Sequence, residues 1–257
     1  MKYTYEFSSA KHKRDIPKPS EDRVFVDGDR GIFVVLDGIT RLHSEYEADP
    51  GKSAVCDVNE IFLGAVIEYL SANIDGDPEL ILRAAARLGN EGIREYRKGK
   101  TLSEWGFYPG TLGVIAILRG SRLHFLCAGD CIAAVVRKTS RLFFGAEPAL
   151  EAIDKDKPSK EDRYRLYCNH PESPLGYTIF NGDEGAQETA CYSYIDLSCG
   201  DRVLMASDGI SSLVKYERIS ALKALSAEEM IAASARFDVP PFAEYADDKS
   251  IIVIDIK

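Results

Sequence analysis

Four short acidic segments, spread over almost the whole chain, constrain this sequence more than any other feature. They are Glu21-Asp22, Asp37-Gly38, Asp208-Gly209 and Asp247-Asp248. The last three adjoin apolar, β-branched runs at residues 32–36, 203–206 and 251–254, so we expect their carboxylates at strand ends, where they can converge. Such convergence is costly unless cations lie between the charges, and hard oxygen ligands suit Mg²⁺ or Mn²⁺. The pattern predicts a metal site.

Each Asp-Gly pair alone has a simpler explanation. Asp and Gly are common in strand-ending turns, and Asp-Gly is a strong hairpin signal. One such pair would therefore indicate only a turn. The set of four favours the metal site.

Composition sets the class of protein. The chain has 257 residues, of which 45% are hydrophobic, which is ordinary for a globular protein. No linker or internal repeat divides it, so we expect one domain spanning residues 1–257. No run approaches the roughly 18 apolar residues of a membrane span, and residues 1–10 lack the apolar segment of a signal peptide. These features predict a soluble, cytoplasmic protein without a membrane partner.

The charge balance disfavours nucleic acid as a partner. Thirty-two basic and forty-one acidic side chains leave a net charge of −9, which repels phosphate backbones. A local basic cluster between residues 11 and 18 lacks interleaved aromatic residues, and it can still meet an anionic substrate.

The six cysteines are too scattered for a disulfide framework, and none has the spacing of a zinc site. We expect reduced thiols. Cys131 and Arg137 have the Cys-x5-Arg spacing of cysteine-dependent phosphatases. However, the residues between them are apolar and β-branched, so they predict a strand rather than a phosphate-binding loop.

Periodicity predicts two helices in the first half of the chain. Apolar residues recur at helical spacing from Val58 to Leu70, and Asp57 with Glu60 forms a potential capping box, which predicts a helix of about 14 to 16 residues. Asp77-Pro78 is an N-cap and first-turn proline for a second helix continuing to Tyr96. We expect an antiparallel helix pair.

The remaining elements alternate between strands and helices. The runs 112–118, 123–126 and 132–136 predict an antiparallel meander, and residues 138–187 an exposed segment over the sheet edge. Further on we expect strands at 192–197, 202–206 and 250–256, a helix at 216–225, and another from the capping box at 226–229 to about residue 236. This order predicts an α+β fold with two stacked antiparallel sheets and helices on the outer faces.

Six motifs follow one another along the chain. They are SEDRVFV at 20–26, FVVLDG at 33–38, GTLGV at 110–114, GDC at 129–131, LSCGDRVLMASDG at 197–209 and DDKSIIV at 247–253. Their order and spacing resemble the metal-dependent protein phosphatases of type 2C, the PPM family, including its bacterial members. The resemblance implies a four-layer α-β-β-α sandwich with helix pairs on the outside, and a variable, flap-like segment within 138–187.

The resemblance also implies roles for individual residues. Asp37 would bridge two divalent ions, the Gly38 carbonyl would add an oxygen ligand, and Asp208 and Asp247 would hold one of the ions. Asp37, Asp208 and Asp247 are therefore the expected catalytic set.

Three further acidic residues would complete the centre. Glu21 and Asp22 would act on the other ion, directly or through water. Asp130 resembles a position that, in bacterial members, joins the aspartate of the Ser-Asp-Gly motif around a weaker third ion.

The implied activity is hydrolysis of phosphoserine and phosphothreonine in proteins. Two Mn²⁺ or Mg²⁺ ions roughly 3.5 to 4 Å apart can lower the pKa of a water held between them and bind the phosphoryl oxygens. No protein nucleophile is then required.

The chain departs from the family pattern at three places. Ile39 replaces the histidine that many eukaryotic members use as an acid. The position of the family's phosphate-binding arginine falls at Pro17, so Arg14 or Lys18 would take that role. Asp248 replaces the asparagine of the terminal Asp-Asn motif. An alternative is therefore a catalytically inactive binding or scaffold module.

Overall fold

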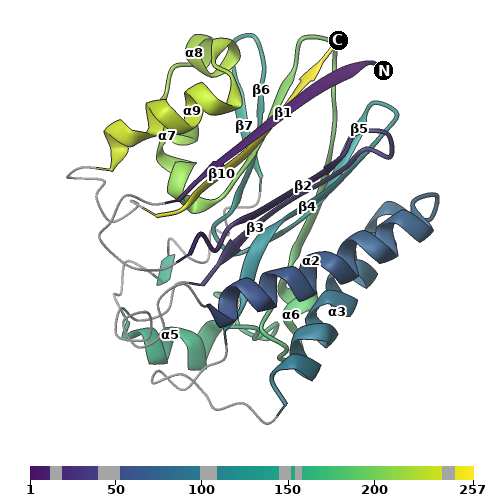
Figure 1. Ribbon diagram of the computed structural model, residues 1–257, viewed down its shortest axis with the longest axis vertical. Helices are drawn as coiled ribbons and strands as arrows, with labels where there is room; N and C mark the ends of the chain where they lie inside the picture. Colours follow the sequence, from purple (N-terminus) through teal and green to yellow (C-terminus); the bar gives the residue numbers. More distant parts are fainter. Residues whose placement is uncertain (12–18, 40–52, 99–108, 145–151, 154–157, 239–246) are drawn as a thin grey trace.

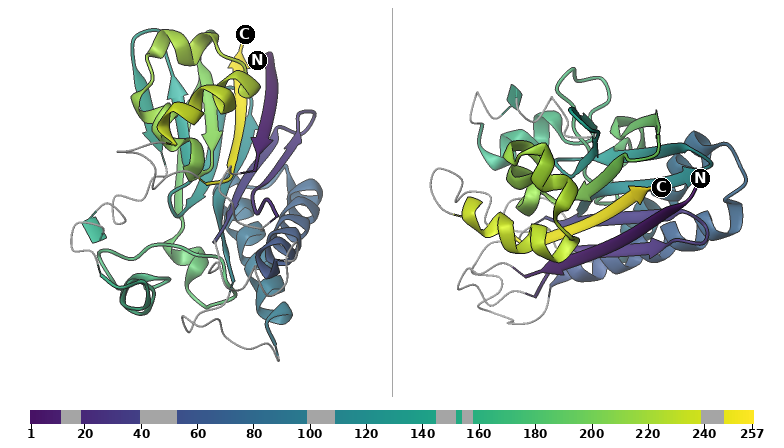
Figure 2. Two further views of the ribbon diagram at one scale, coloured as in Figure 1. Left: turned by 60° about the vertical axis from the view of Figure 1, so that its left-hand side comes forward. Right: turned by 90° about the horizontal axis from the view of Figure 1, so that it is seen from above.

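Two five-stranded antiparallel sheets stack face to face in the computed structural model, and helices cover both outer faces (Figure 1). The structure describes residues 1–11, 19–39, 53–98, 109–144, 152–153, 158–238 and 247–257. Figure 2 shows the layers from two further sides, with the chain ends next to each other, where Tyr3 pairs with Ile256. The predicted α+β four-layer sandwich is confirmed.

Each sheet takes strands from both halves of the chain. The first is ordered β2 (Arg23–Asp27), β3 (Ile32–Gly38), β4 (Thr111–Arg119), β5 (Arg122–Ala128) and β8 (Cys191–Asp196). The second is ordered β1 (Tyr3–Ala10), β10 (Lys249–Ile256), β9 (Arg202–Ala206), β6 (Ile132–Val136) and β7 (Arg141–Phe144). The strands predicted at 192–197, 202–206 and 250–256 are confirmed.

The helices form two separate outer layers. The first layer consists of α2 (Ala54–Asn73) and α3 (Pro78–Tyr96), and the second of α7 (Ser211–Tyr216), α8 (Ile219–Ala224) and α9 (Ala227–Ser234). The shorter elements are α5 (Lys160–Tyr167), α6 (Ala186–Thr189) and the 3-10 turns η1 (Asp208–Ile210) and η2 (Ala235–Phe237). None of the helices that the structure describes is long and apolar enough to cross a membrane.

Strand β3 shows how the apolar runs build the core. Val34 and Leu36 face the layer of α2 and α3, whereas Phe33 and Val35 lie between the two sheets. A strand that is buried on both faces needs apolar residues at every position, which explains the uninterrupted run at 32–36. β9 and β10 repeat this arrangement, with alternate residues packed under α7 to α9.

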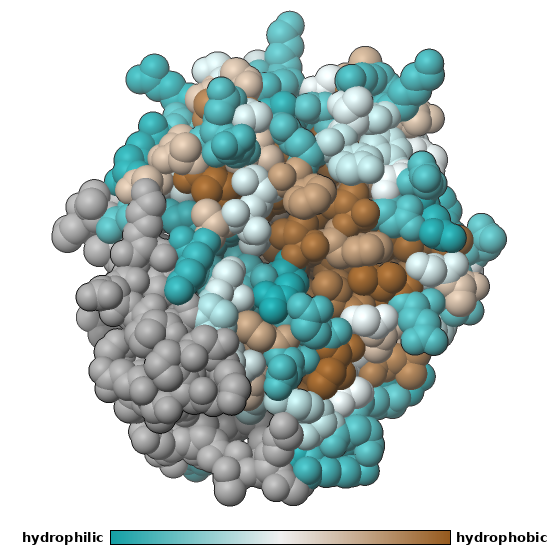
Figure 3. All heavy atoms as spheres, in the orientation of Figure 1, coloured by the Kyte–Doolittle hydropathy of each residue, from teal (hydrophilic) through white to brown (hydrophobic). Residues whose placement is uncertain are grey.

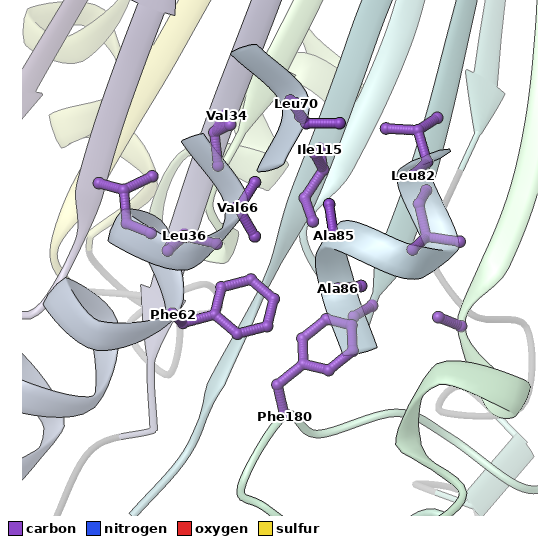
Figure 4. Close-up of a cluster of buried hydrophobic side chains, with 14 of the residues drawn as sticks. Val34, Leu36, Phe62, Val66, Leu70, Leu82, Ala85, Ala86, Ile115 and Phe180 are labelled. Carbon is purple, nitrogen blue, oxygen red and sulfur yellow. The ribbon is translucent and has the colours of Figure 1, made fainter. Parts of the chain in front are cut away.

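A cluster of buried side chains, among them Val34, Leu36 and Val66, holds α2 and α3 on the first sheet (Figure 4). Phe62 of α2 stacks on Phe180 with their ring centroids 4.6 Å apart. A Cβ at Gly89 of α3 would lie 2.5 Å from the Phe62 ring, so glycine allows the two helices to approach closely.

Helix α2 begins earlier than predicted. Its N-cap is Ser53, whose hydroxyl accepts a hydrogen bond from the Val55 amide at 3.2 Å. Asp57 does not cap the helix, because its carboxylate accepts a hydrogen bond from Tyr96 of α3 at 2.6 Å. The start of α3 is as predicted, with Asp77 as its N-cap.

The predicted meander is wrong at its third strand. β4 and β5 pair, but β6 pairs with β9 and β7 in the other sheet. Gly129 has a positive φ of 68°, and the chain crosses from one sheet to the other at this turn. The crossing places Asp130 in the turn that connects the two sheets.

The segment 138–187 is not uniformly exposed, contrary to prediction. Tyr177, Ile179 and Phe180 are buried, and Phe180 exchanges two backbone hydrogen bonds of 2.9 Å with Thr111 of β4. This pairing brings the end of the segment into the core beside β4.

The helix predicted at 216–225 is interrupted. Glu217 is extended, with φ −67° and ψ 152°, and it separates α7 from α8. The Arg141 guanidinium donates to the carbonyl groups of Val214 and Glu217, and so satisfies groups that a continuous helix would have used. The predicted capping box of Ser226 and Glu229 is confirmed at the start of α9.

Apolar side chains gather in the middle of the face that Figure 3 shows, in the region of β1 and β2 in Figure 1. β1 contributes two exposed aromatic residues, Tyr5 and Phe7. Their side chains lie on the side of β1 that faces the other sheet, because their partners Ile254 and Ile252 belong to the cluster between the sheets. These side chains are only partly covered at this edge, where the Tyr5 ring contacts Phe33 of β3.

The stacked pair of phenylalanines provides a test of the packing. We expect Phe62→Ala to lower the free energy of unfolding by about 3–5 kcal/mol, because it removes a fully buried ring and leaves a cavity. Phe7→Ala, at a side chain that is 56% exposed, should cost less than about 1 kcal/mol. Urea unfolding measures both changes, and equal losses would contradict this description of the core.

Candidate metal centre

Three aspartates from different connections converge at one end of the sandwich. Asp37 is near the end of β3, Asp130 lies in the turn between β5 and β6, and Asp208 follows β9. One carboxylate oxygen from each lies within 4.8 Å of the others. The Asp208 amide also points toward Asp37, with its nitrogen 3.5 Å from Oδ2. Residues as distant in sequence as 37 and 208 therefore form one acidic group.

Glycines permit the close approach of the chain around this group. A Cβ at Gly38 would lie 2.3 Å from Val55 Cγ1 and 2.8 Å from the Glu21 Cβ. A Cβ at Gly209 would lie 2.0 Å from the Asp248 carbonyl oxygen. Packing therefore requires a glycine in both of these Asp-Gly pairs.

Electrostatic strain accompanies the convergence. Burial, and then the charge of Asp208, raises the pKa of Asp37 far above its ordinary value. Burial also raises the pKa of Asp208, with Asp130 and Asp247 as the next contributions. Burial raises the pKa of Asp22 to about 7, partly opposed by a hydrogen bond from Ser207. Without a cation, the folded protein therefore favours protonated carboxyl groups here.

Asp247 lies at the edge of the group. It is not one of the three carboxylates that approach within 4.8 Å, but its negative charge contributes to the raised pKa values of Asp37 and Asp208. Its Oδ1 accepts a hydrogen bond of 2.8 Å from the Asp248 amide.

Glu21 and Asp22 are buried beside the group and held by hydroxyl groups. Ser53 donates a hydrogen bond to Glu21 Oε1, and Ser207 donates one to Asp22 Oδ2 at 2.7 Å. The Glu21 amide donates to Asp248 Oδ2 at 2.8 Å, which gives Asp248 a structural partner.

Sequence reasoning missed three residues around these acids: Ser53, Asn59 and Ser207. Ser207 belongs to the Ser-Asp-Gly motif, so its position could have indicated a role. Ser53 and Asn59 carry no motif, and only the packing of α2 against β3 brings them to Glu21.

The two predicted phosphate-binding residues lie outside the described part of the chain. These are Arg14 and Lys18. Ile39 packs against a buried cluster formed by residues 153, 168, 177 and 179.

The sequence around Cys131 does not form the phosphate-binding loop of a cysteine-dependent phosphatase, as its apolar residues predicted. Burial, and then the charge of Asp37, raises the pKa of the Cys131 thiol well above the ordinary value. The residues that follow it form strand β6 rather than a phosphate-binding loop.

The donor set fits a hard divalent cation. The converging side chains offer only carboxylate oxygens, which suit Mg²⁺ or Mn²⁺ better than softer metals. A positive charge between them would also remove the repulsion that raises their pKa values.

Comparisons with solved structures identify the fold. The catalytic domain of the serine/threonine protein phosphatase PstP, in complex with two manganese ions, is 19% identical, with a TM-score of 0.69 and 99% of each chain covered. The chain has the fold of the PPM serine/threonine phosphatases. The PstP/Ppp phosphatase of Mycobacterium tuberculosis is 20% identical, with a TM-score of 0.66 and 99% of each chain covered.

A third neighbour is the PPM Ser-Thr phosphatase MsPP of Mycobacterium smegmatis, in complex with cacodylate. It is 15% identical, with a TM-score of 0.64, and the match covers 99% of this chain and 98% of that one. Neither protein-family models nor curated proteins match this chain. At this level of identity the neighbours establish a common fold, in agreement with the resemblance seen in the sequence.

The raised pKa values predict an unusual pH dependence of stability without metal. A carboxyl group whose pKa is raised by folding stabilises the protein below its unfolded pKa of about 4, and this contribution is lost as pH rises through the folded pKa. For Asp22 that value is about 7, and the values of Asp37 and Asp208 are also raised. We expect Asp208→Asn to be more stable than wild type, by an amount that grows from about pH 5 to pH 8.

Urea unfolding in EDTA at several pH values measures this difference. Asp196→Asn is the control, because an exposed partner, Arg122, lowers the pKa of Asp196. That control should show no such growth above pH 5. Parallel pH curves for wild type and Asp208→Asn would contradict the electrostatic description of the site.

Proposed function

We propose that this protein is a metal-dependent phosphatase that hydrolyses phosphoserine and phosphothreonine in proteins. The observation that carries the proposal is the convergence of Asp37, Asp130 and Asp208 at one end of the sandwich. The same fold occurs in PstP, which was crystallised with two manganese ions. We further propose that the chain acts as one domain in the cytoplasm.

The proposed cofactors are two Mn²⁺ or Mg²⁺ ions. Asp37 would bridge them with help from the Gly38 carbonyl, and Asp208 and Asp247 would hold one ion. Glu21 and Asp22 would serve the other, and Asp130 with Asp208 would serve a third. When bound, such ions lower the pKa of a coordinated water and neutralise charge on phosphoryl oxygens.

We propose that the side chains of the protein position the ions and the substrate, and that none of them acts as the nucleophile. Cys131, the thiol beside Asp130, stays protonated and buried. Ile39 has no proton to donate, so we propose that solvent protonates the leaving alkoxide. Arg14 or Lys18 remains the proposed phosphate-binding cation.

We propose that the segment 138–187 selects the substrate. Its buried residues Tyr177 and Ile179 form the cluster on which Ile39 packs, two positions after Asp37. Thr111 binds both this segment, through Phe180, and the Asp37 carbonyl, through its hydroxyl at 3.1 Å. A change in the conformation of this flap-like segment would therefore alter the position of Asp37.

Activity provides the direct test. We expect Mn²⁺-dependent hydrolysis of p-nitrophenyl phosphate and of a phosphothreonine peptide. Asp208→Asn should lower the rate at least about 100-fold, because it removes a charged ligand from the centre. Asp196→Asn, at an exposed aspartate paired with Arg122 on β5 and β8, should keep wild-type activity.

Two negative results together would contradict the proposed phosphatase activity. If no divalent ion supports hydrolysis and calorimetry detects no stoichiometric Mn²⁺ binding, the enzymatic proposal fails. The chain would then be a binding module that retains the sandwich.

A further inference from the structure

The first turn of α2 is tied directly to Glu21. The Ser53 hydroxyl accepts a hydrogen bond from the Val55 amide at 3.2 Å and donates one to Glu21 Oε1. Both residues are buried, with exposed fractions of 7% for Ser53 and 1% for Glu21. One side chain thus caps the helix and holds the carboxylate of Glu21, whose Cβ packs beside Gly38.

A second residue of α2 holds the backbone of Glu21. The Asn59 amide nitrogen donates a hydrogen bond to the Glu21 carbonyl, and Asn59 is fully buried. From the other sheet, Asp248 Oδ2 accepts a hydrogen bond of 2.8 Å from the Glu21 amide. Glu21 is therefore held from both sides of the sandwich.

Asn59 would destabilise the fold relative to an apolar residue if its role were purely structural. Its Oδ1 is buried without a hydrogen-bond partner among the described residues. An unsatisfied buried acceptor is unfavourable, and an apolar residue would pack α2 without this penalty. The amide therefore indicates a requirement for the one bond that it makes, to Glu21.

We propose that Ser53 and Asn59 are positioning residues of the metal centre, which fix Glu21 toward a second divalent cation. The proposal rests on the proposed function. Helix α2 suits this role, because its packing in the core holds both side chains in place. Partners that orient ligands commonly affect metal affinity by about 10- to 100-fold.

Ser53→Gly separates positioning from helix capping. Glycine is a tolerated N-cap, so the helix start is retained while the donor to Glu21 is lost. We expect Mn²⁺ titration calorimetry of the full chain, without substrate, to show about 10- to 100-fold weaker binding of one ion and unchanged binding of the other. Ser53→Thr, which keeps a hydroxyl, should restore the affinity.

Ser226→Gly is the matched control. Ser226 also caps a helix, α9, because its hydroxyl accepts a hydrogen bond from the Glu229 amide. Its partner belongs to the capping box of α9 and not to the acidic group. This variant should bind Mn²⁺ as the wild type does. Thermal unfolding of both variants in EDTA shows how much stability each cap contributes.

A double-mutant cycle shows whether Ser53 acts through Glu21. Glu21→Gln alone should lower the affinity for the same Mn²⁺ ion, and adding Ser53→Gly should lower that affinity no further. Asn59→Ala provides an independent variant, with the same expected loss of affinity for that ion.

Two results would overturn the proposal. One is unchanged Mn²⁺ affinity in both Ser53→Gly and Asn59→Ala, with only reduced thermal stability. The other is full additivity of Ser53→Gly with Glu21→Gln. Failure of the proposed function is distinguishable, because the wild type itself would then bind no Mn²⁺.

Discussion

Repulsion among carboxylates is the constraint on which the candidate site depends. The fold holds one carboxylate oxygen of each of Asp37, Asp130 and Asp208 within 4.8 Å of the others. Burial together with neighbouring charges raises the pKa values of Asp37 and Asp208. The apolar clusters on both faces of each sheet stabilise the fold and offset this cost. A cation between these carboxylates would remove their repulsion.

The sandwich brings the acids together by its topology. The chain crosses from one sheet to the other at Gly129, which places Asp130 in the turn that connects the two sheets. Gly38 and Gly209 then permit contacts that a side chain would block. Helix α2 completes the arrangement from outside, because Ser53 and Asn59 reach through to Glu21. Residues outside the motifs therefore hold Glu21 in place.

Sequence patterns predicted those features whose causes are local. The Asp77 cap and the capping box at Ser226 were found because each depends on residues within one helical turn. The Asp57 cap was wrong, since a distant tyrosine, Tyr96, takes that carboxylate. The meander was wrong for a similar reason, because strand pairing between sheets depends on contacts across the whole chain.

The sequence alone determined the apolar strands, the acidic residues at their ends and hence the oxygen-rich chemistry of the candidate metal site, because side-chain type and spacing are local properties. Only the tertiary structure decided that β6 joins β9, that Phe180 is buried against Phe62, and that Ser53 rather than Asp57 caps α2. These features arise from contacts between segments far apart in the chain, and no local pattern records them.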